Sequence, residues 1–245
     1  MVDYIGGIDT EFYRVLAKYY DEIFTLKEQQ RKFLRAFVER EKLNSVLDVG
    51  CGTGTLALEL SAWGVSATGI DLSDAMIDIA CHKAAQQGST AKFLAADMLA
   101  LDRLRGQFDA VVCVGNTLPH LTQPAQLQLA MEQFAVKSHC LLLQVVNYDR
   151  ILAQNVTELP EICTPNLVFR RYYKHLPGMI EFSMRLETAN PKEVLTAVNN
   201  LVPLTRQDLV NIFAGTGWEA TDWWGSYAGE KWSVDGAATI VALRR

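Results

Sequence analysis

The sequence is poor in the residue patterns that bind metals or form disulfides. Its cysteines are spread over 245 residues, with no C-x-x-C pair and no nearby histidine pattern typical of zinc ligation. The five are Cys51, Cys81, Cys113, Cys140 and Cys163. We therefore expect reduced, mostly buried thiols and no metal site.

The sequence also lacks a long hydrophobic run and an excess of basic charge. No stretch approaches the roughly 18 apolar residues that identify a membrane span, and the amino terminus shows no basic region followed by an apolar core. Lys and Arg number 23 against 28 Asp and Glu, and the net charge is −5. Dispersed basic residues create no field that holds a phosphate backbone. We predict a cytoplasmic protein whose partner is a small molecule, with no binding to nucleic acid or membranes.

What the sequence does contain is an alternation of strand and helix patterns over residues 45–147. This rhythm predicts an α/β fold in which parallel strands are joined by right-handed crossovers. Residues 11–24 and 26–42 precede it and carry apolar residues at helical spacing. The length of the chain favours one domain.

The rhythm changes after residue 147. Three strand patterns follow one another, at 168–175, 179–187 and 194–202, with connections short enough for an antiparallel meander. A helix pattern from Thr205 and strand patterns at 218–224 and 238–243 follow. We predict a single domain 1–245 with four parts: N-terminal helices (1–44), a ligand-binding core (45–152), a β insertion that covers the carboxyl edge of the sheet (153–203), and a helix and hairpin that complete the core (204–245).

The most informative segment is Val-Leu-Asp-Val-Gly-Cys-Gly-Thr-Gly at residues 46–54. Glycines after a buried strand allow a tight turn and a close approach to a ligand, and the following helix begins with unpaired N–H groups. The spacing is G-x-G-x-G, whereas the dinucleotide fingerprint is G-x-G-x-x-G. With Asp48 upstream, the run resembles the first motif of class I S-adenosylmethionine (SAM) dependent methyltransferases.

Further positions at predicted strand ends match the same family. Asp71 ends the second strand, where a carboxylate can accept hydrogen bonds from both ribose hydroxyls of SAM or of NAD. Leu72 and Met76 belong to a D-x-S-x-x-M pattern whose apolar residues flank adenine in the family, and Asp97-Met98 matches the position that reads the adenine edge. A lone aspartate at a strand end is more often a helix cap or turn residue, so the prediction depends on its combination with the glycine loop.

A longer resemblance covers residues 45–152. Residues 108–121, FDAVVCVGNTLPHL, resemble the F-D-x-V-x-x-x-G-N-S/T-x-x-H-L segment of glycine N-methyltransferase-like enzymes, and 147–152, NYDRIL, resemble their N-Y-D-x-I-L. The usual Pro-Gly-Gly turn is replaced at 136–140, which we interpret as a change in a surface turn. The resemblance implies a Rossmann-like, seven-stranded, mostly parallel sheet with helices on both faces, plus an antiparallel β insertion over the active site.

The resemblance further implies SAM as cofactor and S-adenosylhomocysteine as product. The implied cofactor-binding residues are Tyr13, Asp48, Gly50, Cys51, Gly52, Gly54, Asp71, Leu72, Met76, Asp97, Met98 and Val114. Asp48 is interpreted as a buried support that accepts backbone N–H bonds beneath the loop. Tyr13, Tyr19 and Tyr20 include candidates to close over SAM, as an amino-terminal tyrosine does in related enzymes. Helical core packing explains most of these tyrosines equally well.

Methyl transfer from a sulfonium is an in-line displacement, so the protein must chiefly align the acceptor and exclude water. An amine acceptor must lose its proton, and a hydroxyl acceptor needs a base. We predict that His120 is this base and that Asn116 orients the acceptor or the methionine end of SAM. The alternatives are a turn histidine hydrogen-bonded to backbone and a turn asparagine beside Gly115.

The insertion supplies candidates for acceptor binding. Strand alternation places Arg171, Tyr173 and His175 on one face and Arg170, Tyr172 and Lys174 on the other. An arginine on either face can hold an acceptor carboxylate, and the alternative is a solvated edge strand. We predict Tyr148, Arg171 and Tyr173 as acceptor-binding residues. Near the last hairpin, Trp223, Trp224, Tyr227 and Trp232 suggest a cage for a methylated ammonium, or core packing or an interface.

The sequence thus predicts a SAM-dependent methyltransferase that acts on nitrogen or oxygen of a small molecule, as a monomer or homodimer. One alternative is an NAD-dependent oxidoreductase, for which no Tyr-x-x-x-Lys pair is suitably placed. A second alternative is a SAM-binding module without catalytic activity, because a binding loop does not prove turnover.

Overall fold

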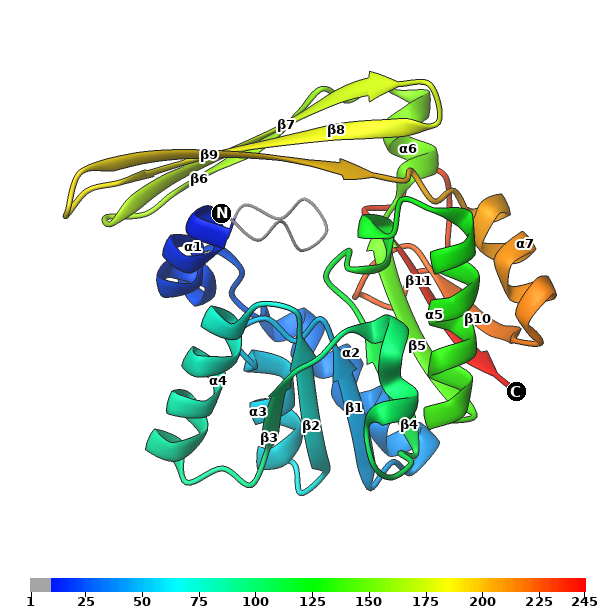
Figure 1. Cartoon of the computed structure of the whole chain (residues 1–245). Helices are drawn as coiled ribbons and strands as arrows, with labels where there is room; N and C mark the ends of the chain where they lie inside the picture. The colour runs from blue at the N-terminus through cyan, green and yellow to red at the C-terminus, as the bar shows by residue number, and fades with distance from the viewer. Residues whose placement is uncertain (1–9) are drawn as a thin grey trace.

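A computed structural model describes residues 10–245, which form two β-sheets with helices around them (Figure 1). The larger sheet has seven strands in the order β10-β11-β5-β4-β1-β2-β3. They are β1 (Ser45–Val49), β2 (Ser66–Asp71), β3 (Lys92–Ala95), β4 (Ala110–Cys113), β5 (Cys140–Val146), β10 (Glu219–Trp224) and β11 (Ala238–Arg244). Strands β5, β4, β1, β2 and β3 run parallel, while β11 is antiparallel to both β5 and β10. The predicted Rossmann-like, seven-stranded sheet is confirmed.

Alternating side chains of the central strands divide the core into two layers. Leu47 and Val111 lie in a buried cluster with α5 and α7, whereas Val46 and Val112 lie in a second cluster with α2, α3 and α4. The helices are α2 (Glu28–Glu41), α3 (Thr55–Ala62), α4 (Asp74–Gln87), α5 (Pro124–Lys137) and α7 (Arg206–Thr216). Both faces of the sheet are therefore covered, as the almost continuous apolar character of its strands requires.

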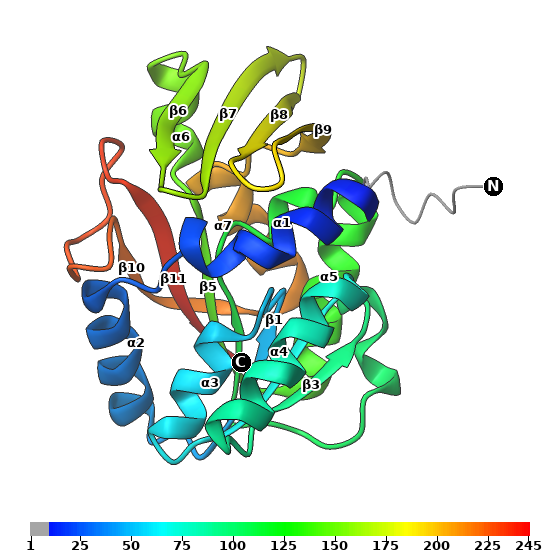
Figure 2. The same ribbon diagram turned by 90° about the vertical axis from the view of Figure 1, so that its left-hand side faces the viewer.

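The insertion forms the second sheet, which has four antiparallel strands in the order β6-β7-β8-β9. Its strands are β6 (Glu158–Cys163), β7 (Leu167–Leu176), β8 (Met179–Thr188) and β9 (Glu193–Leu201), and the short helix α6 (Tyr148–Ala153) leads into it from β5. Figures 1 and 2 show this sheet spread above the seven-stranded sheet like a cover. The predicted antiparallel insertion is confirmed.

Helix α1 (Thr10–Ile23) lies between the two sheets (Figure 2). Its residues Phe12 and Leu16 share a buried cluster with Met76 of α4 and with Phe169 and Leu186 of the four-stranded sheet. The helix thereby connects the four-stranded sheet to α4.

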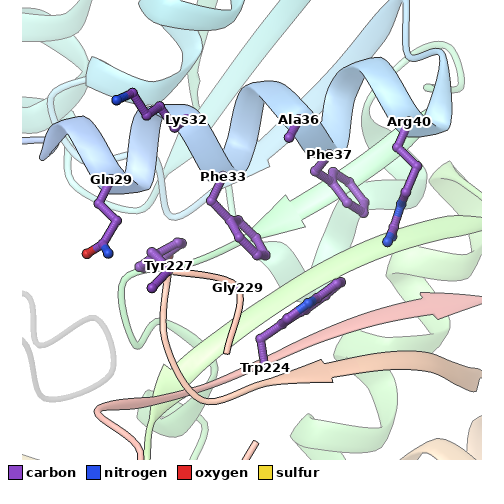
Figure 3. Close-up of a pocket in the computed structure, with 10 residues that line it drawn as sticks. Gln29, Lys32, Phe33, Ala36, Phe37, Arg40, Trp224, Tyr227 and Gly229 are labelled. Carbon is purple, nitrogen blue, oxygen red and sulfur yellow. The ribbon is translucent and has the colours of Figure 1, made fainter. Parts of the chain in front are cut away.

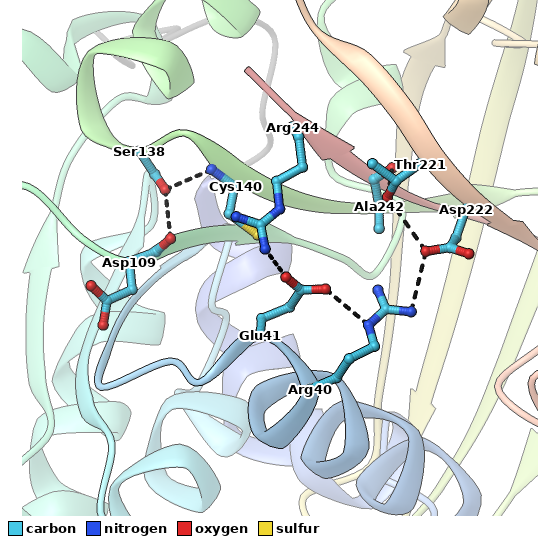
Figure 4. A network of polar contacts seen from close by, with 9 residues as sticks. All are labelled: Arg40, Glu41, Asp109, Ser138, Cys140, Thr221, Asp222, Ala242 and Arg244. Atoms are coloured by element: carbon cyan, nitrogen blue, oxygen red, sulfur yellow. Dashed lines mark hydrogen bonds and ion pairs between the residues drawn. The ribbon is translucent and has the colours of Figure 1, made fainter.

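The turn before β5 is more buried than the sequence suggested. Lys137 is 3% exposed, and its ammonium group donates to the carbonyl oxygen of Leu104. The Ser138 hydroxyl donates to the Asp109 carbonyl over 2.9 Å and accepts the Cys140 N–H over 3.0 Å (Figure 4). The prediction of a surface turn therefore holds for Val136 and His139, which are exposed, but not for Lys137 and Ser138, whose buried side chains satisfy backbone groups.

Ion pairs attach α2 to the hairpin at the sheet edge. Arg40 lies 3.2 Å from a carboxylate oxygen of Asp222, and Glu41 pairs with Arg244 (Figure 4). Exposed ion pairs contribute little singly, so these contacts chiefly orient the helix.

Most predicted elements occur within one to three residues of their expected bounds. The strand β6 and the helix α6 were not predicted. In β6, Pro160 and the mostly exposed side chains are typical of an edge strand, whose weak apolar pattern gives little signal.

The remaining helical segments of the described chain are two 3-10 helices, η1 (Met98–Arg103) and η2 (Leu118–His120). No helix within residues 10–245 is long and apolar enough to cross a membrane. The division of the chain into one domain with four parts stays a prediction.

Candidate active site

The glycine loop joins β1 to α3 and is bent by left-handed backbone conformations. The N–H groups of Gly50 and Cys51 each donate to the carbonyl of Ile70 over 2.9 Å, which holds the loop against β2. Gly50 and Gly52 have φ of 72° and 53°, a region that disfavours residues with a side chain. A Cβ atom at Gly52 would lie 2.8 Å from the Tyr20 ring. The loop is thus shaped to let other groups approach its backbone closely.

Asp71 lies at the end of β2 and faces this loop. Its Oδ2 accepts the Gly52 N–H over 2.9 Å, and its Oδ1 accepts the Ser73 N–H over 3.0 Å. Burial raises the pKa of this carboxyl, while backbone N–H groups, including that of Leu72, oppose the increase. Each oxygen keeps acceptor capacity after one such bond, so both can also receive ribose hydroxyls. The Leu72 side chain beside it is 45% exposed.

Asp48 is buried beneath the loop and carries an acceptor without a partner. It is 2% exposed, and its Oδ2 forms no hydrogen bond with the described residues. Burial first, and then the charge of Asp71, raises the pKa of Asp48 to about 7, against a hydrogen bond from the Ala57 N–H. A buried carboxylate oxygen without a donor is costly unless a ligand supplies one. The ammonium group of SAM is such a donor, so this position fits the methionine end of the cofactor.

The positions expected at the adenine end have mixed surroundings. Asp97 is exposed and caps η1 by accepting the Leu99 N–H over 2.8 Å. Met98 and Met76 are 7% and 2% exposed and pack in two different buried clusters. The side chains of Met76 and Met98 therefore pack in the core. A ligand at this end would chiefly contact the backbone of these residues.

Two further predicted residues line the loop region. The Cys51 thiol is partly buried and lies 3.5 Å from the Gly52 carbonyl, and burial raises the pKa of the thiol. The Val114 carbonyl accepts the Thr117 hydroxyl over 3.0 Å at the end of β4. A Cβ at Gly50 would lie 2.5 Å from this Thr117 side chain, so the ends of β1 and β4 meet here. Gly54 directly precedes α3 as its N-cap residue.

The tyrosine that packs on the glycine loop is Tyr20. The hydroxyl of Tyr13 instead accepts a hydrogen bond from Asn199 Nδ2 on β9 over 2.8 Å, so it ties α1 to the insertion. Desolvation is the main cause that raises the pKa of both tyrosines, and the charge of Asp71 adds to it. The helical spacing of aromatic residues in α1 identified both rings as candidates but could not distinguish their positions.

Sequence reasoning missed a polar network that fixes α1 to the loop. Asp21 Oδ1 accepts the hydroxyls of Thr53 and Thr55 over 2.5 and 2.9 Å, and Lys83 Nζ of α4 lies 2.5 Å from Asp21 Oδ2. Burial raises the pKa of Asp21, but the hydrogen bonds from Lys83, Thr53 and Thr55 outweigh it and the net pKa is lowered. These residues are too distant in sequence to form a recognisable motif.

On the acceptor side, Asn116 is held by two hydrogen bonds. Its φ of 68° is left-handed, its Oδ1 accepts the Val146 N–H over 2.9 Å, and its Nδ2 donates to the Tyr148 hydroxyl over 3.0 Å. Tyr148 is fully buried. Because Asn116 is already engaged at both ends, it joins the ends of β4 and β5 and sets the position of the Tyr148 hydroxyl.

His120 ends the short helix η2, close to the insertion. The Pro119 carbonyl accepts the Val202 N–H over 2.9 Å, which holds η2 against the chain that follows β9. The His120 residue is exposed, and no hydrogen bond to its ring is formed within the described part of the chain. Although the residue is exposed, the protein atoms around the ring partly desolvate it and lower its pKa, which favours a neutral imidazole that can accept a proton at pH 7.

Arg171 and Tyr173 lie on the inner face of the four-stranded sheet. Tyr173 is 4% exposed and packs on Phe182, with 5.4 Å between ring centroids. Burial raises the pKa of its hydroxyl to about 12, against the charges of Arg171 and Arg150. Desolvation lowers the pKa of the Arg171 guanidinium. The alternative of a solvated edge strand therefore does not describe the face of β7 that carries Arg171 and Tyr173.

The aromatic residues near the last hairpin separate into two groups. Trp224 and Tyr227 pack edge to face on Phe33 of α2, with ring centroids 5.1 and 5.5 Å apart, beside an open hollow of about 470 Å³ (Figure 3). Trp223 and Trp232 instead lie 5.0 and 4.8 Å from the guanidinium carbon of Arg206. Packing accounts for both groups, and they do not form one cage.

Comparisons with known proteins agree with this arrangement. Residues 46–137 match the model of a family described as a methyltransferase domain. A glycine/sarcosine N-methyltransferase from Parasynechococcus marenigrum (strain WH8102) is 33% identical over 129 residues, which are 51% of this chain and 46% of that protein. The chain thus spans about half the length of the curated relatives it matches.

Solved structures resemble the whole fold. A SAM-dependent methyltransferase from Clostridium acetobutylicum has a TM-score of 0.82 at 14% identity, over 96% of this chain and 97% of the other. A SAM-bound amino pentose methyltransferase, CalS10 from Micromonospora echinaspora, has a TM-score of 0.68 at 21% identity, over 94% and 96%. At these identities the likeness shows the fold. Together with the family match over residues 46–137, it supports the resemblance predicted from the glycine loop.

Proposed function

We propose that this chain is a class I SAM-dependent methyltransferase that transfers the methyl group of SAM to a nitrogen or oxygen of a small molecule by in-line displacement. The observation that carries the proposal is the pair of Asp71 and Asp48 on either side of the glycine loop. Asp71 has spare acceptor capacity for a ribose, and Asp48 has a buried oxygen without a donor. Bound SAM supplies an electrophilic methyl group on a sulfonium.

The residues of the chain then hold the cofactor and exclude water. Asp71, Asp48 and the backbone of Gly50 and Gly52 bind the two ends of SAM, and Tyr20 covers the loop. Cys51, Gly54, Leu72, Met76, Asp97, Met98, Val114 and Tyr13 complete the proposed cofactor site. The packing of α1 against α4 and the four-stranded sheet supports its role in shielding the site from solvent.

On the other side, Tyr148, Arg171 and Tyr173 bind the acceptor, and Asn116 positions the Tyr148 hydroxyl. His120 accepts the proton that the acceptor loses, either directly or through one water. The lowered pKa of its ring supports this role, because a neutral imidazole is a competent base near neutral pH. Alignment in a dry site is the main contribution of the protein to this reaction.

We further propose a cytoplasmic monomer or homodimer that acts without nucleic acid or a membrane. The net charge of −5 supports a small-molecule acceptor over a polyanion. The NAD-dependent alternative is not favoured, because the relatives named above are methyltransferases.

The proposal is tested by isothermal titration with SAM, S-adenosylhomocysteine and NADH side by side, followed by an acceptor screen. Micromolar binding of the first two and release of S-adenosylhomocysteine with an amine or hydroxyl acceptor would support it. Binding of SAM without turnover on any acceptor would favour the non-catalytic module. Binding of NADH alone would reject the cofactor assignment.

A further inference from the structure

Two neighbouring arginines on β7 have opposite surroundings. Arg170 points to the outer face of the four-stranded sheet and forms ion pairs with Glu161 and Glu187. Arg171 points inward and forms no ion pair with a carboxylate in the described part of the chain. Its Nη2 donates to the Pro160 carbonyl over 2.8 Å, while its Nε is buried without a partner. Arg170 therefore has two carboxylate partners, whereas Arg171 has none within residues 10–245 and its guanidinium carbon lies 5.5 Å from the centre of the Phe169 ring.

A second unpaired guanidinium belongs to Arg150 on α6. Its Nε is also buried without a hydrogen-bond partner, and residues 10–245 provide no carboxylate within ion-pair distance of it. Tyr148 and Ile151, which flank Arg150 on α6, share a buried cluster with Tyr173 of β7, so α6 packs on the strand that carries Arg171. In agreement, burial raises the pKa of the Tyr173 hydroxyl and the charges of Arg171 and Arg150 both lower it. Tyr148, two residues before Arg150, also interacts electrostatically with Tyr173.

This neighbourhood is connected to the cofactor loop by one short segment. Thr117 lies against Gly50, because a Cβ atom added to that glycine would be only 2.5 Å from the Thr117 side chain. The preceding residue, Asn116, donates to the Tyr148 hydroxyl over 3.0 Å. The glycine loop, Asn116-Thr117 and the Tyr148 hydroxyl are therefore neighbours in space, and Tyr148 shares a buried cluster with Tyr173.

We propose that Arg150 and Arg171 bind an anionic group of the methyl acceptor, a carboxylate or a phosphate, with the Tyr173 hydroxyl as a third donor. This inference rests on the proposed function for the identity of the bound molecule as an acceptor. When Arg150 and Arg171 hold the anionic group, the rest of the acceptor extends past Tyr148 toward the glycine loop. The methyl group is transferred there.

The physical reason is the cost of an uncompensated charge in a partly dry site. A buried guanidinium nitrogen without an acceptor loses its hydration and gains nothing in return. Desolvation already lowers the pKa of Arg171. Carboxylates and phosphates match the planar fork of arginine and form paired, charge-assisted hydrogen bonds, so such a ligand satisfies both side chains.

The test uses isothermal titration of the full chain with sodium phosphate and, separately, sodium acetate, each with and without saturating S-adenosylhomocysteine. The variants are Arg150→Met and Arg171→Met, with Arg171→Lys as a conservative partner. Arg170→Met is the matched control, because it removes the neighbouring charge on the outer face of the same strand. Affinity for S-adenosylhomocysteine and thermal melting report whether each variant is folded.

We expect the unmodified chain to bind at least one anion saturably, and each inward variant to weaken that binding by at least about tenfold. Arg171→Lys should recover part of the affinity, and Arg170→Met should leave it within about twofold. Tighter phosphate than acetate would identify a phosphorylated acceptor, and the reverse order a carboxylate. No saturable binding, or equal binding by all variants, would overturn the inference. Failure to bind S-adenosylhomocysteine would instead reject the proposed function, while the titrations without it still decide whether the arginines bind an anion.

Discussion

The hydroxyl of Thr53 in the glycine loop donates a hydrogen bond over 2.5 Å to the Oδ1 of Asp21 on α1. Thr53 is 1% exposed, whereas the Asp21 side chain is 46% exposed, so the bond lies at the boundary between the loop and solvent. Through it, α1 and the glycine loop are held together. Lys83 Nζ, 2.5 Å from the other oxygen of Asp21, extends the connection to α4.

Replacing Asp21 by Ala should detach α1 from the glycine loop. The hydroxyls of Thr53 and Thr55 would lose their acceptor, and the Lys83 ammonium would lose its carboxylate partner. We expect a loss of about 1–3 kcal/mol in the free energy of unfolding, and faster hydrogen exchange in α1, measured by mass spectrometry. Glu11→Ala, which removes an exposed ion pair with Arg14 on the same helix, is the control and should change stability by less than about 0.5 kcal/mol. Equal exchange in the two variants would contradict the role of Asp21.

Replacing Asp71 by Ala should weaken SAM binding by about 1–3 kcal/mol, the range for losing a hydrogen-bond partner to a charged group. The variant also frees the N–H groups of Gly52 and Ser73, so the loop loses part of its support. Titration calorimetry measures the affinity. Asp74→Ala, at an exposed position in the first turn of α4, is the comparison and should bind SAM normally. An unchanged affinity in the Asp71 variant would remove this residue from the site.

SAM affinity should rise with pH up to about 7. The pKa of Asp48 is raised to about 7 by burial, so below this pH the free protein holds a proton there, and an ammonium group can bind only after that proton leaves. For the same reason, the contribution of Asp48 to stability of the free protein falls as pH rises from its unfolded value of 3.8 to about 7. Calorimetry between about pH 5.5 and 7.5, below the range in which the amino group of SAM itself titrates, should show proton release on binding. The slope should disappear in Asp48→Asn, and a slope that persists there would assign the proton to another group.

Replacing Gly52 by Ala should cost more than the same change at Gly88. Both glycines have a positive φ, of 53° and 61°, so each substitution carries a backbone penalty of about 1 kcal/mol. The new Cβ at Gly52 would also lie 2.8 Å from the Tyr20 ring, whereas nothing lies within 4 Å at Gly88. We expect a lower melting temperature and weaker SAM binding for Gly52→Ala than for Gly88→Ala. Equal stability of the two variants would show that Tyr20 moves aside without cost.

Loss of the His120 imidazole should reduce turnover while SAM affinity stays nearly the same. If the ring accepts the acceptor's proton, turnover of the unmodified chain should fall on the acid side, below the ordinary histidine pKa of 6.5, because desolvation lowers its pKa. His120→Gln should lose this acid limb and about 10²–10⁴ in kcat. A change in SAM affinity alone would make His120 a binding residue.

The sequence by itself determined the sheet and the cofactor loop, because both depend on local patterns. Apolar strands alternating with helical segments predict a parallel sheet, and Gly50, Gly52 and Gly54 directly after β1 predict a tight turn at its carboxyl edge. Asp71 was placed correctly beside that loop for the same reason, since the ends of neighbouring parallel strands meet at one edge.

Only the tertiary structure decided which side chains meet across long intervals. Asp21, Thr53 and Lys83 come from three separate segments, and no spacing rule connects them. Strand alternation divided Arg170 from Arg171 but could not say which of them faces the interior, because that depends on how the insertion packs on α1 and α6. Local sequence specifies local backbone geometry, whereas burial and unpaired charge result from the packing of distant elements, and the candidate acceptor site depends on both.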